Sequence, residues 1–303
     1  MLSTFSGPGQ WYKGNLHAHT NLSDGILSPE ALVSRYKALG YSFLTLADHR
    51  VYHHHDELCE ETFLTLPGLE LDASFGDRPG KHYHHIVGVG LAQLPDGFRR
   101  ESEGENAGDT AQRHITWLLG EGMLPIYCHP RWSMATVDEV ARLTGFCMIE
   151  VYNHLCQRQD GSGEAEAWWD HLLWEGWRVL CTASDDTHQK INDIGGGFIM
   201  VKAQSLTREA ILASLRAGRF YASQGPVIED IRRMDGTLTV STSPAASIAF
   251  VCYPYRGYQE NADKTLITQA AWHPPEGARY VRLVVTDCEG RKAWSQPIDW
   301  EGM

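Results

Sequence analysis

Five short stretches of the chain carry histidine and carboxylate side chains at spacings typical of metal sites. They are HAHTNLSD (17–24), ADH (47–49), GLE (68–70), YCHP (127–130) and SDDTH (184–188). Most of them follow a short apolar run, where a buried strand is predicted to end. Imidazole and carboxylate groups that converge from several strand ends are the ligands of a centre holding two or three divalent metal ions.

The first stretch contains His17 and His19, which are separated by one residue. On a strand this spacing points both side chains to the same face, so both can reach one metal ion. Asp24 follows through the turn-prone NLSDG and can return a carboxylate to the same place. The alternative is a pair of partly buried histidines bonded to the backbone.

The next two stretches predict His49 and Glu70 as ligands. We expect Asp48 to accept a hydrogen bond from His49, because ligating imidazoles usually need such an acceptor. The alternative for Asp48 is a cap with His49 exposed. Glu70 ends PGLEL and can bridge two ions with its two oxygens, the alternative being a surface glutamate near a turn.

Two further histidine clusters require a choice. KHYHHIVGVG offers His82, His84 and His85, of which His85 directly precedes the apolar run and is favoured, with His84 as the alternate. The triple histidine at 53–55 lies on a polar connection, so we expect it to be exposed to solvent rather than to bind metal.

The last two stretches complete the set. His129 precedes Pro130, which favours a sharp exit from a strand. Arg131 then lies close enough to contact an anionic substrate group, the alternative being a solvated arginine, and Lys13 and Arg158 are less favoured for the same role. In SDDTH, Asp186 and His188 have the same alternate spacing as the first pair. Asp185 then faces the other side or supports a ligand, and an Asx-turn is the alternative role for either aspartate.

Composition limits the classes of function. The net charge of −12 over 303 residues argues against a nucleic-acid polymer as main partner. Seven scattered cysteines without a CxxC pair indicate reduced thiols. With no predicted signal peptide or membrane span, we expect a soluble cytoplasmic protein.

The pattern of elements divides the chain into two predicted domains. Over residues 1–226, apolar runs alternate with helix-like segments, which is typical of α/β folds. The predicted strands are 14–19, 42–49, 84–90, 123–129, 146–153 and 178–186. The predicted helices are 28–40, 111–120, 137–145, 165–176 and 205–218. Residues 227–303 read as alternating strands and predict a small antiparallel β-sandwich.

The chain resembles the PHP (polymerase and histidinol phosphatase) metal-dependent phosphoesterases. The matching motifs over 13–226 are GNLHAHT…SDG, TLADH, GLE, HIVGVG, CHP, IEVYN, SDDTH and RAGRFYASQGP. The resemblance implies a distorted (β/α)7 TIM-like barrel with its site at the C-terminal strand ends. It also implies two or three Mn, Zn or Fe ions, held by His17, His19, Asp24, His49, Glu70, His85, His129, Asp186 and His188. Arg50 departs from the pattern, which often has Asp or Asn there.

The expected activity is hydrolysis of a small phosphorylated metabolite or nucleotide by a metal-bridging hydroxide. Glu70 is expected to bridge the ions, Arg131 to neutralise phosphate charge, and His188 or an arginine-bound water to protonate the leaving group. The alternatives are an amide or carbamate hydrolase on the same site, and a non-catalytic metal-binding scaffold.

Overall fold

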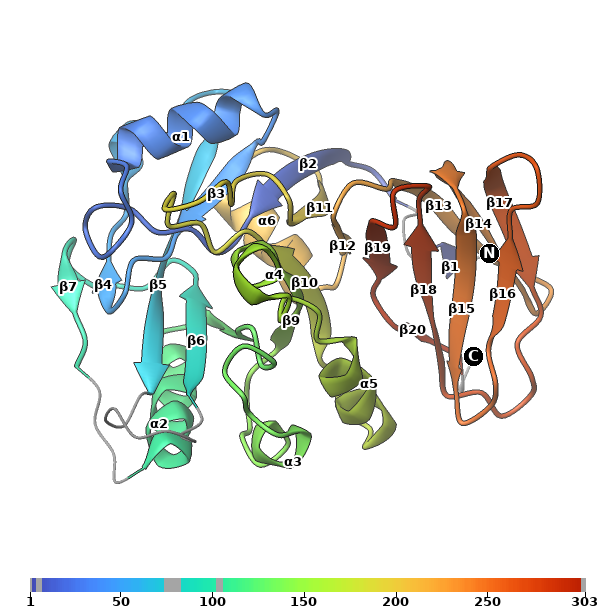
Figure 1. Cartoon of the computed structure of the whole chain (residues 1–303). Coiled ribbons are helices and arrows are strands. Elements are labelled where there is room, and N and C mark those ends of the chain that lie inside the picture. The colour runs from blue at the N-terminus through green and yellow to red at the C-terminus, as the bar shows by residue number, and fades with distance from the viewer. Residues whose placement is uncertain (1, 4–6, 74–82, 102–105, 301–303) are drawn as a thin grey trace.

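The computed structural model describes residues 2–3, 7–73, 83–101 and 106–300. An α/β part and a group of C-terminal strands lie side by side (Figure 1). The helices are α1 (Pro29–Ala38), α2 (Ala107–Gly120), α3 (Val137–Val140), α4 (His154–Asp160), α5 (Glu166–Trp174) and α6 (Arg208–Arg216), with a 3-10 turn η1 (Asp56–Leu58).

The strands fall into those of the α/β part and a second group made of the C-terminal strands and β1. Those of the α/β part are β2 (Gln10–Asn15), β3 (Phe43–Leu46), β4 (Val51–Tyr52), β5 (Leu64–Ala73), β6 (His84–Val89), β7 (Phe98–Arg99), β8 (Leu124–Tyr127), β9 (Met148–Asn153), β10 (Leu180–Ser184), β11 (Phe198–Ala203) and β12 (Phe220–Ser223). The remaining strands are β1 (Leu2–Ser3), β13 (Ile228–Met234), β14 (Thr237–Ala245), β15 (Ser247–Tyr253), β16 (Tyr258–Asn261), β17 (Ile267–Trp272), β18 (Tyr280–Thr286), β19 (Lys292–Ser295) and β20 (Ile298–Asp299).

Local sequence signals account for the helix ends. At the start of α1 the Ser28 side chain accepts a hydrogen bond from Ala31 N, and Pro29 takes the first helical position. At the start of α6 the Thr207 side chain likewise accepts a hydrogen bond from Ala210 N. The prediction for 137–145 was wrong in length, because α3 is a single capped turn. After it, the Arg142 and Leu143 amides bond to carbonyls three residues back, and this tightening ends the helix.

One large mixed sheet organises the α/β part. Its strands follow the order β10-β9-β8-β6-β5-β3-β2-β11-β12 and continue through β19-β18-β15-β16. The pairs β2–β3, β3–β5, β8–β9 and β9–β10 are parallel, whereas β6 is antiparallel to both β5 and β8. The start of β6 therefore lies at the same edge as the C-terminal ends of its parallel neighbours.

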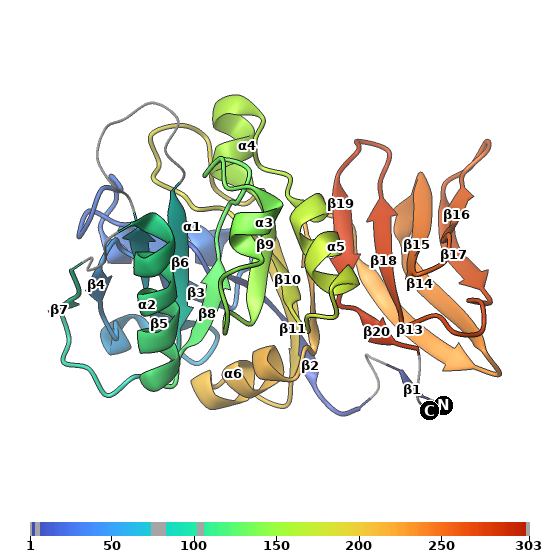
Figure 2. The ribbon, with the colours of Figure 1, turned by 90° about the horizontal axis from the view of Figure 1, so that it is seen from below.

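The segments that follow β2 and β10 meet beyond that edge. His19 N donates to Thr187 O at 3.0 Å, and Asp186 N donates to His17 O at 2.9 Å. These bonds join the first and last strands of the series β10 to β2 at the edge that carries the predicted ligands, while α2, α3, α5 and α6 lie around the strands (Figure 2).

The C-terminal strands form a second apolar cluster. The sheet β1-β13-β14-β17 and the strands β15 and β18 of the large sheet both contribute to it. Among the described residues, no helix is both long and apolar enough to cross a membrane.

A buried arginine links the C-terminal strands to α5. Arg282 on β18 is 2% exposed, and it donates to both carboxylate oxygens of Asp170 at 2.8 Å and to Glu166 at 3.3 Å. Its guanidinium also lies 4.8 Å from the ring centroid of Trp169. The bidentate pair is the geometry in which arginine binds carboxylate most strongly.

We predict that Arg282→Met lowers the free energy of unfolding by about 3–5 kcal/mol, because it removes the guanidinium that pairs with the partly buried carboxylate of Asp170. Arg232→Met, which removes an exposed pair with Asp230 on β13, serves as the control and is expected to cost about 1 kcal/mol or less. Urea unfolding of both variants checks this, and equal losses would contradict it.

Candidate metal centre

The predicted ligands come from six segments that the sheet brings to one edge. His17 and His19 follow β2, His49 follows β3, His129 follows β8, and Asp186 and His188 follow β10. His85 lies near the start of β6, which the antiparallel direction of that strand places at the same edge. The groups of side chains whose ligand atoms lie within 4.8 Å of one another include all nine predicted ligands.

The central group is fully buried. It contains His17, His19, Glu70 and Asp186. The Nε2 atoms of His17 and His19 face each other at 3.1 Å, and Asp186 Oδ1 lies 3.1 Å from each of them. Glu70 Oε2 lies at 3.4 Å and 3.2 Å from the same two nitrogens.

Glu70 joins this group to a second one. Its Oε1 atom lies 2.8 Å from His85 Nδ1 and 3.4 Å from His129 Nε2. Its Oε2 atom faces His17 and His19 as above. Each oxygen of one buried carboxylate thus faces a different set of imidazole nitrogens, which is the arrangement of a bridging carboxylate.

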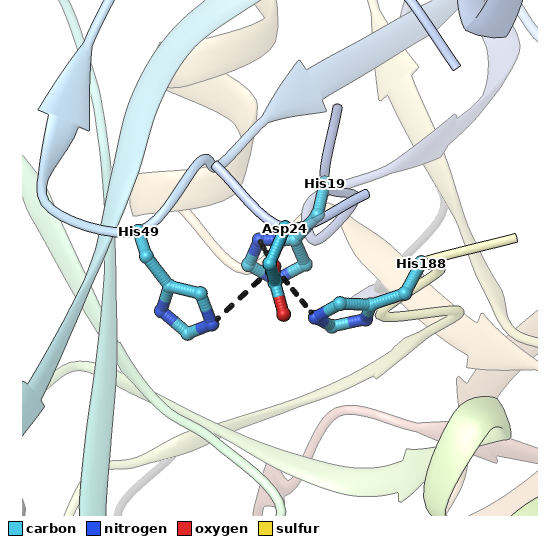
Figure 3. Close-up of side chains that lie close together, drawn as sticks. All are labelled: His19, Asp24, His49 and His188. Atoms are coloured by element: carbon cyan, nitrogen blue, oxygen red, sulfur yellow. Dashed lines mark ion pairs between the residues drawn. The ribbon is translucent and has the colours of Figure 1, made fainter. Parts of the chain in front are cut away.

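A third group lies nearer to solvent. Figure 3 shows Asp24 among the rings of His19, His49 and His188. Asp24 Oδ1 lies 3.1 Å from His188 Nε2, 3.8 Å from His49 Nε2 and 3.9 Å from His19 Nδ1. Because His19 belongs to this group and to the central one, the three groups are continuous.

The charges of the three groups are strongly coupled. Burial alone lowers the pKa of His19, but its hydrogen bonds to Asp186 and Glu70 prevail and raise it to about 9. Burial also lowers the pKa of His17, but attraction to the charged carboxylates of Asp186, Glu70 and Glu150 raises it overall. The surrounding histidines lower the pKa values of Glu70 and Asp186 against the effect of burial. By contrast, burial lowers the pKa of His49 to about 4.

The donor set fits divalent cations. His19 Nδ1 and His49 Nδ1 are buried without a partner in hydrogen-bond geometry, although oxygens of Asp24 and Glu70 lie 3.9 Å and 3.1 Å from them. Asp186 Oδ1 is also buried and faces two imidazole nitrogens at 3.1 Å. Buried polar atoms normally have a partner, and lone pairs that converge without one are what a bound cation would satisfy. Mixed imidazole and carboxylate ligands suit Zn, Mn and Fe better than Mg or Ca.

Backbone geometry helps to aim two of these side chains. Asp186 and His129 have φ angles of 53° and 28°, in the left-handed region that non-glycine residues seldom adopt. Strain of this kind persists where the surrounding structure holds it and is concentrated at functional sites.

The structure separates the residues between which the sequence left a choice. His84 turns away from the three groups, and its Nδ1 lies 2.6 Å from the Tyr127 hydroxyl. Asp185 accepts from the Tyr36 hydroxyl at 2.7 Å and from the amides of the 195–197 loop at 2.7–2.9 Å. Burial raises the pKa of Asp185 to about 6 in spite of these donors. His82 lies outside the described residues.

Three structural expectations are corrected. Asp48 does not support His49 but accepts from Thr20 N, Thr20 Oγ1 and Ser23 Oγ at 2.6–2.8 Å, which shapes the loop before Asp24. Glu70 is not at a strand end, because β5 continues to Ala73. The Asp186–His188 segment is not extended, since Asp186 adopts a left-handed conformation.

The triple histidine at 53–55 lies outside the three groups, but it is not simply exposed. His53 Nδ1 lies 3.0 Å from Asp96 Oδ2, and His54 Nε2 lies 3.0 Å from Leu94 O. His55 is buried.

A pocket of about 500 Å³ opens onto the three groups. The cationic side chains that line it are not the expected Arg131. Arg158 and Lys190 line it, together with Trp132 and Ile191. Lys190 Nζ lies 3.3 Å from Asp24 Oδ2. Arg131 is exposed and is not among the lining residues, because the turn after Pro130 presents Trp132 there instead. Lys13 is directed elsewhere, to the rings of Tyr41 and Phe198.

Sequence reasoning missed Glu150, which lies in the middle of β9. It is 2% exposed, and its Oε1 accepts from His17 Nδ1 at 2.8 Å. Its carboxylate also accepts from His129 N at 3.0 Å, from Asn153 Nδ2 at 2.9 Å and from the Ser184 hydroxyl. Because Glu150 accepts the proton on Nδ1 of His17, the lone pair on Nε2 of the same ring is directed at the central group. A charged residue within the apolar run FCMIEVYN was the signal available in the sequence.

We predict that Glu150→Gln weakens metal binding by about 10–100-fold, because the amide no longer fixes the tautomer and orientation of His17. Glu229→Gln, an exposed change on β13, is the matched control and should leave binding unchanged. Titration with Mn²⁺ or Zn²⁺ measures both, and an unaltered affinity for Glu150→Gln would rule out this role.

The raised pKa of His19 predicts a second property. Below about pH 9 its imidazole carries an extra proton in the metal-free protein, and a ligating imidazole must lose it. Metal affinity should therefore rise with pH up to about 9, and binding at pH 7.5 should release about one proton or more. Calorimetry in buffers of different ionisation enthalpy checks this; a buffer-independent heat would refute it.

Comparison with solved structures gives the class of fold. A two-domain protein from Bacteroides vulgatus containing a predicted PHP-like metal-dependent phosphoesterase superimposes with a TM-score of 0.51, with 17% identity over 96% of each chain. A protein from Bifidobacterium adolescentis named as a metal-dependent phosphoesterase (16% identity, 68% of this chain and 96% of that one) has a TM-score of 0.45. An amidohydrolase from Chromobacterium violaceum (17%, 59% and 89%) has a TM-score of 0.43.

The chain has the α/β fold of the PHP-like protein from B. vulgatus over nearly its whole length. The PHP resemblance noted in the sequence is thus confirmed at the level of the fold. No protein-family profile and no curated protein matched the chain.

Proposed function

We propose that this protein is a metal-dependent phosphoesterase that hydrolyses a small phosphorylated metabolite or nucleotide. The observation that carries the proposal is the position of Glu70, whose two buried oxygens face separate sets of imidazole nitrogens at 2.8–3.4 Å. A carboxylate shared in this way suits a centre that holds more than one divalent ion.

The ligands would be those predicted from the sequence, namely His17, His19, Asp24, His49, Glu70, His85, His129, Asp186 and His188, and they would hold two or three Mn, Zn or Fe ions. Ions bound there would lower the pKa of a water molecule towards neutrality and polarise a phosphoryl oxygen. This chemistry does not require a nucleophilic side chain.

The protein's own groups would bind and orient the substrate. Arg158 and Lys190 take the place that the sequence assigned to Arg131, because they line the pocket where an anionic group must enter. His188 Nδ1 lies 2.9 Å from the carbonyl oxygen of Asp186, so Nδ1 carries a proton and donates it to that oxygen. The other ring nitrogen, Nε2, lies on the side of Asp24 and can offer its lone pair to a metal ion there. That tautomer favours the ligand role of His188 over proton donation. A pocket of about 500 Å³ suits a small molecule.

The architecture proposed with this function is a distorted seven-stranded barrel over 1–226 followed by a β-sandwich over 227–303. The hydrogen bonds of His17 and His19 to the segment after β10 support closure of the barrel at the ligand edge. The shared cluster of the C-terminal strands supports the sandwich. A cytoplasmic location belongs to the same proposal.

The double variant His17→Ala/His19→Ala tests the function. It should lose bound metal and lower kcat/KM for phosphate esters by about 10³-fold or more, since loss of even one preorganised electrostatic contact costs about 10²–10³. His53→Ala/His54→Ala removes two histidines outside the three groups and should keep both properties. Metal content and hydrolysis that survive in the first variant would overturn the proposal.

The same centre would also serve an amide or carbamate hydrolase, because attack on a carbonyl carbon needs similar groups. Parallel assays with nitrophenyl phosphate, a phosphodiester and carboxylic or carbamate esters separate the two activities. Preference for the carboxylic or carbamate esters would refute the phosphoesterase, and metal binding without any hydrolysis would indicate a scaffold.

A further inference from the structure

A second cleft lies at the junction between the α/β part and the C-terminal strands, away from the metal centre. It has a volume of about 610 Å³ and is bordered by the loop after α5, the C-terminal end of α6, the start of β18 and β20. Figure 2 shows α6 and β20 on the same side of the molecule. Leu180, the first residue of β10, lines this cleft, whereas Asp186 of the metal centre follows the other end of the same strand. The two ends of β10 are about 13 Å apart at the usual rise per residue.

The charged side chains of this cleft are mostly positive, whereas the net charge of the whole chain is negative. Its charged lining residues are Arg178, Arg216, Arg279 and Asp299, and we call it the arginine cleft. An adjoining hollow of about 200 Å³, which shares Leu180, Ala217, Gly218 and Pro297 with it, adds Arg219. The net charge of the chain is −12, yet three or four arginines face one aspartate here. The cleft is therefore a local concentration of positive charge, which the net charge of the chain does not reveal.

Arg178, Arg216 and Arg279 are exposed, and the contacts they make with the described residues use few of their donors. Arg178 Nη1 lies 3.6 Å from Asp299 Oδ2, but both side chains are exposed, and such pairs contribute little. Arg216 gives one N–H to Gly122 O at 2.9 Å, and the Arg279 guanidinium lies 5.6 Å from the ring of Tyr253. Each arginine has five N–H donors, so the fork that matches an oxyanion remains available.

Trp177 and Tyr280 form an aromatic part of the cleft wall. Trp177 is half-buried, and its ring lies 5.7 Å from that of Phe146. Tyr280 is buried, and it stacks on Tyr253 at 6.2 Å. Several cations beside two aromatic side chains offer a small ligand both charge and an apolar surface, and the volume lies in the usual range of a small-molecule site.

From this arrangement we infer that the arginine cleft is a second binding site, for a small oxyanion carrying two or more negative charges as phosphate or carboxylate groups. The guanidinium forks of Arg178, Arg216 and Arg279 bind the charged groups, and Trp177 covers the rest of the ligand. The inference does not depend on the proposed function, because the cleft shares no lining residue with the pocket of the metal centre.

Calorimetric titration of the full chain with pyrophosphate, citrate, AMP and adenosine tests this. At least one of the three anions should bind, and adenosine should not, because it lacks the charged group. Comparing the affinities for pyrophosphate and AMP with the affinity for citrate shows whether the site prefers phosphate or carboxylate groups. Comparing AMP with pyrophosphate shows whether the aromatic wall contributes.

Two matched double variants locate the site. Arg178→Gln/Arg279→Gln should weaken binding by about tenfold or more, since each lost charge-assisted hydrogen bond costs that much. Arg113→Gln on the exposed face of α2 should keep the affinity of the parent chain. Arg158→Gln/Lys190→Gln, which neutralises the pocket of the metal centre, should leave intact the binding event that Arg178→Gln/Arg279→Gln weakens. Thermal melting confirms that all three variants fold. Absence of binding by every anion, or loss of binding only in Arg158→Gln/Lys190→Gln, overturns the inference.

Discussion

The placement of one buried carboxylate, Glu70, is the constraint on which the rest of the site depends. It is 1% exposed and lies within β5, where a charge is costly unless opposite charges or donors surround it. The chain supplies that surrounding from every neighbouring strand: imidazoles face both oxygens. The order of strands in the sheet can be understood as the means by which these imidazoles reach a single point.

The reversed strand β6 is the clearest example. In a wholly parallel sheet, a ligand near the start of a strand lies at the edge opposite to those that follow the strands. Because β6 is antiparallel to β5 and β8, His85 reaches Glu70 from the beginning of its strand. The left-handed conformations of His129 and Asp186 have the same effect at the ends of β8 and β10, since they redirect side chains that a regular strand would point elsewhere.

A set of buried carboxylates outside the three groups keeps the surrounding loops in place. Glu150 orients His17, Asp48 holds the loop before Asp24, and Asp185 binds the amides of the 195–197 loop. Each is satisfied by several donors, as a buried carboxylate must be. In the sequence these residues look like the ligands beside them, because aspartate and glutamate serve both purposes and only their partners differ.

The sequence by itself determined which residue types could bind metal and, through periodicity and capping, most of the strands and helices that carry them. Ser28 and Thr207 begin their helices as their sequence contexts predict, because capping is decided within a few residues. Only the tertiary structure places His85 and not His84 beside Glu70, Asp186 and not Asp185 beside His17, and Arg158 and Lys190 instead of Arg131 in the pocket lining. Those choices depend on the direction of β6, on φ at a single residue and on which turn faces the pocket. They are set by contacts between segments far apart in the chain, which local sequence does not encode.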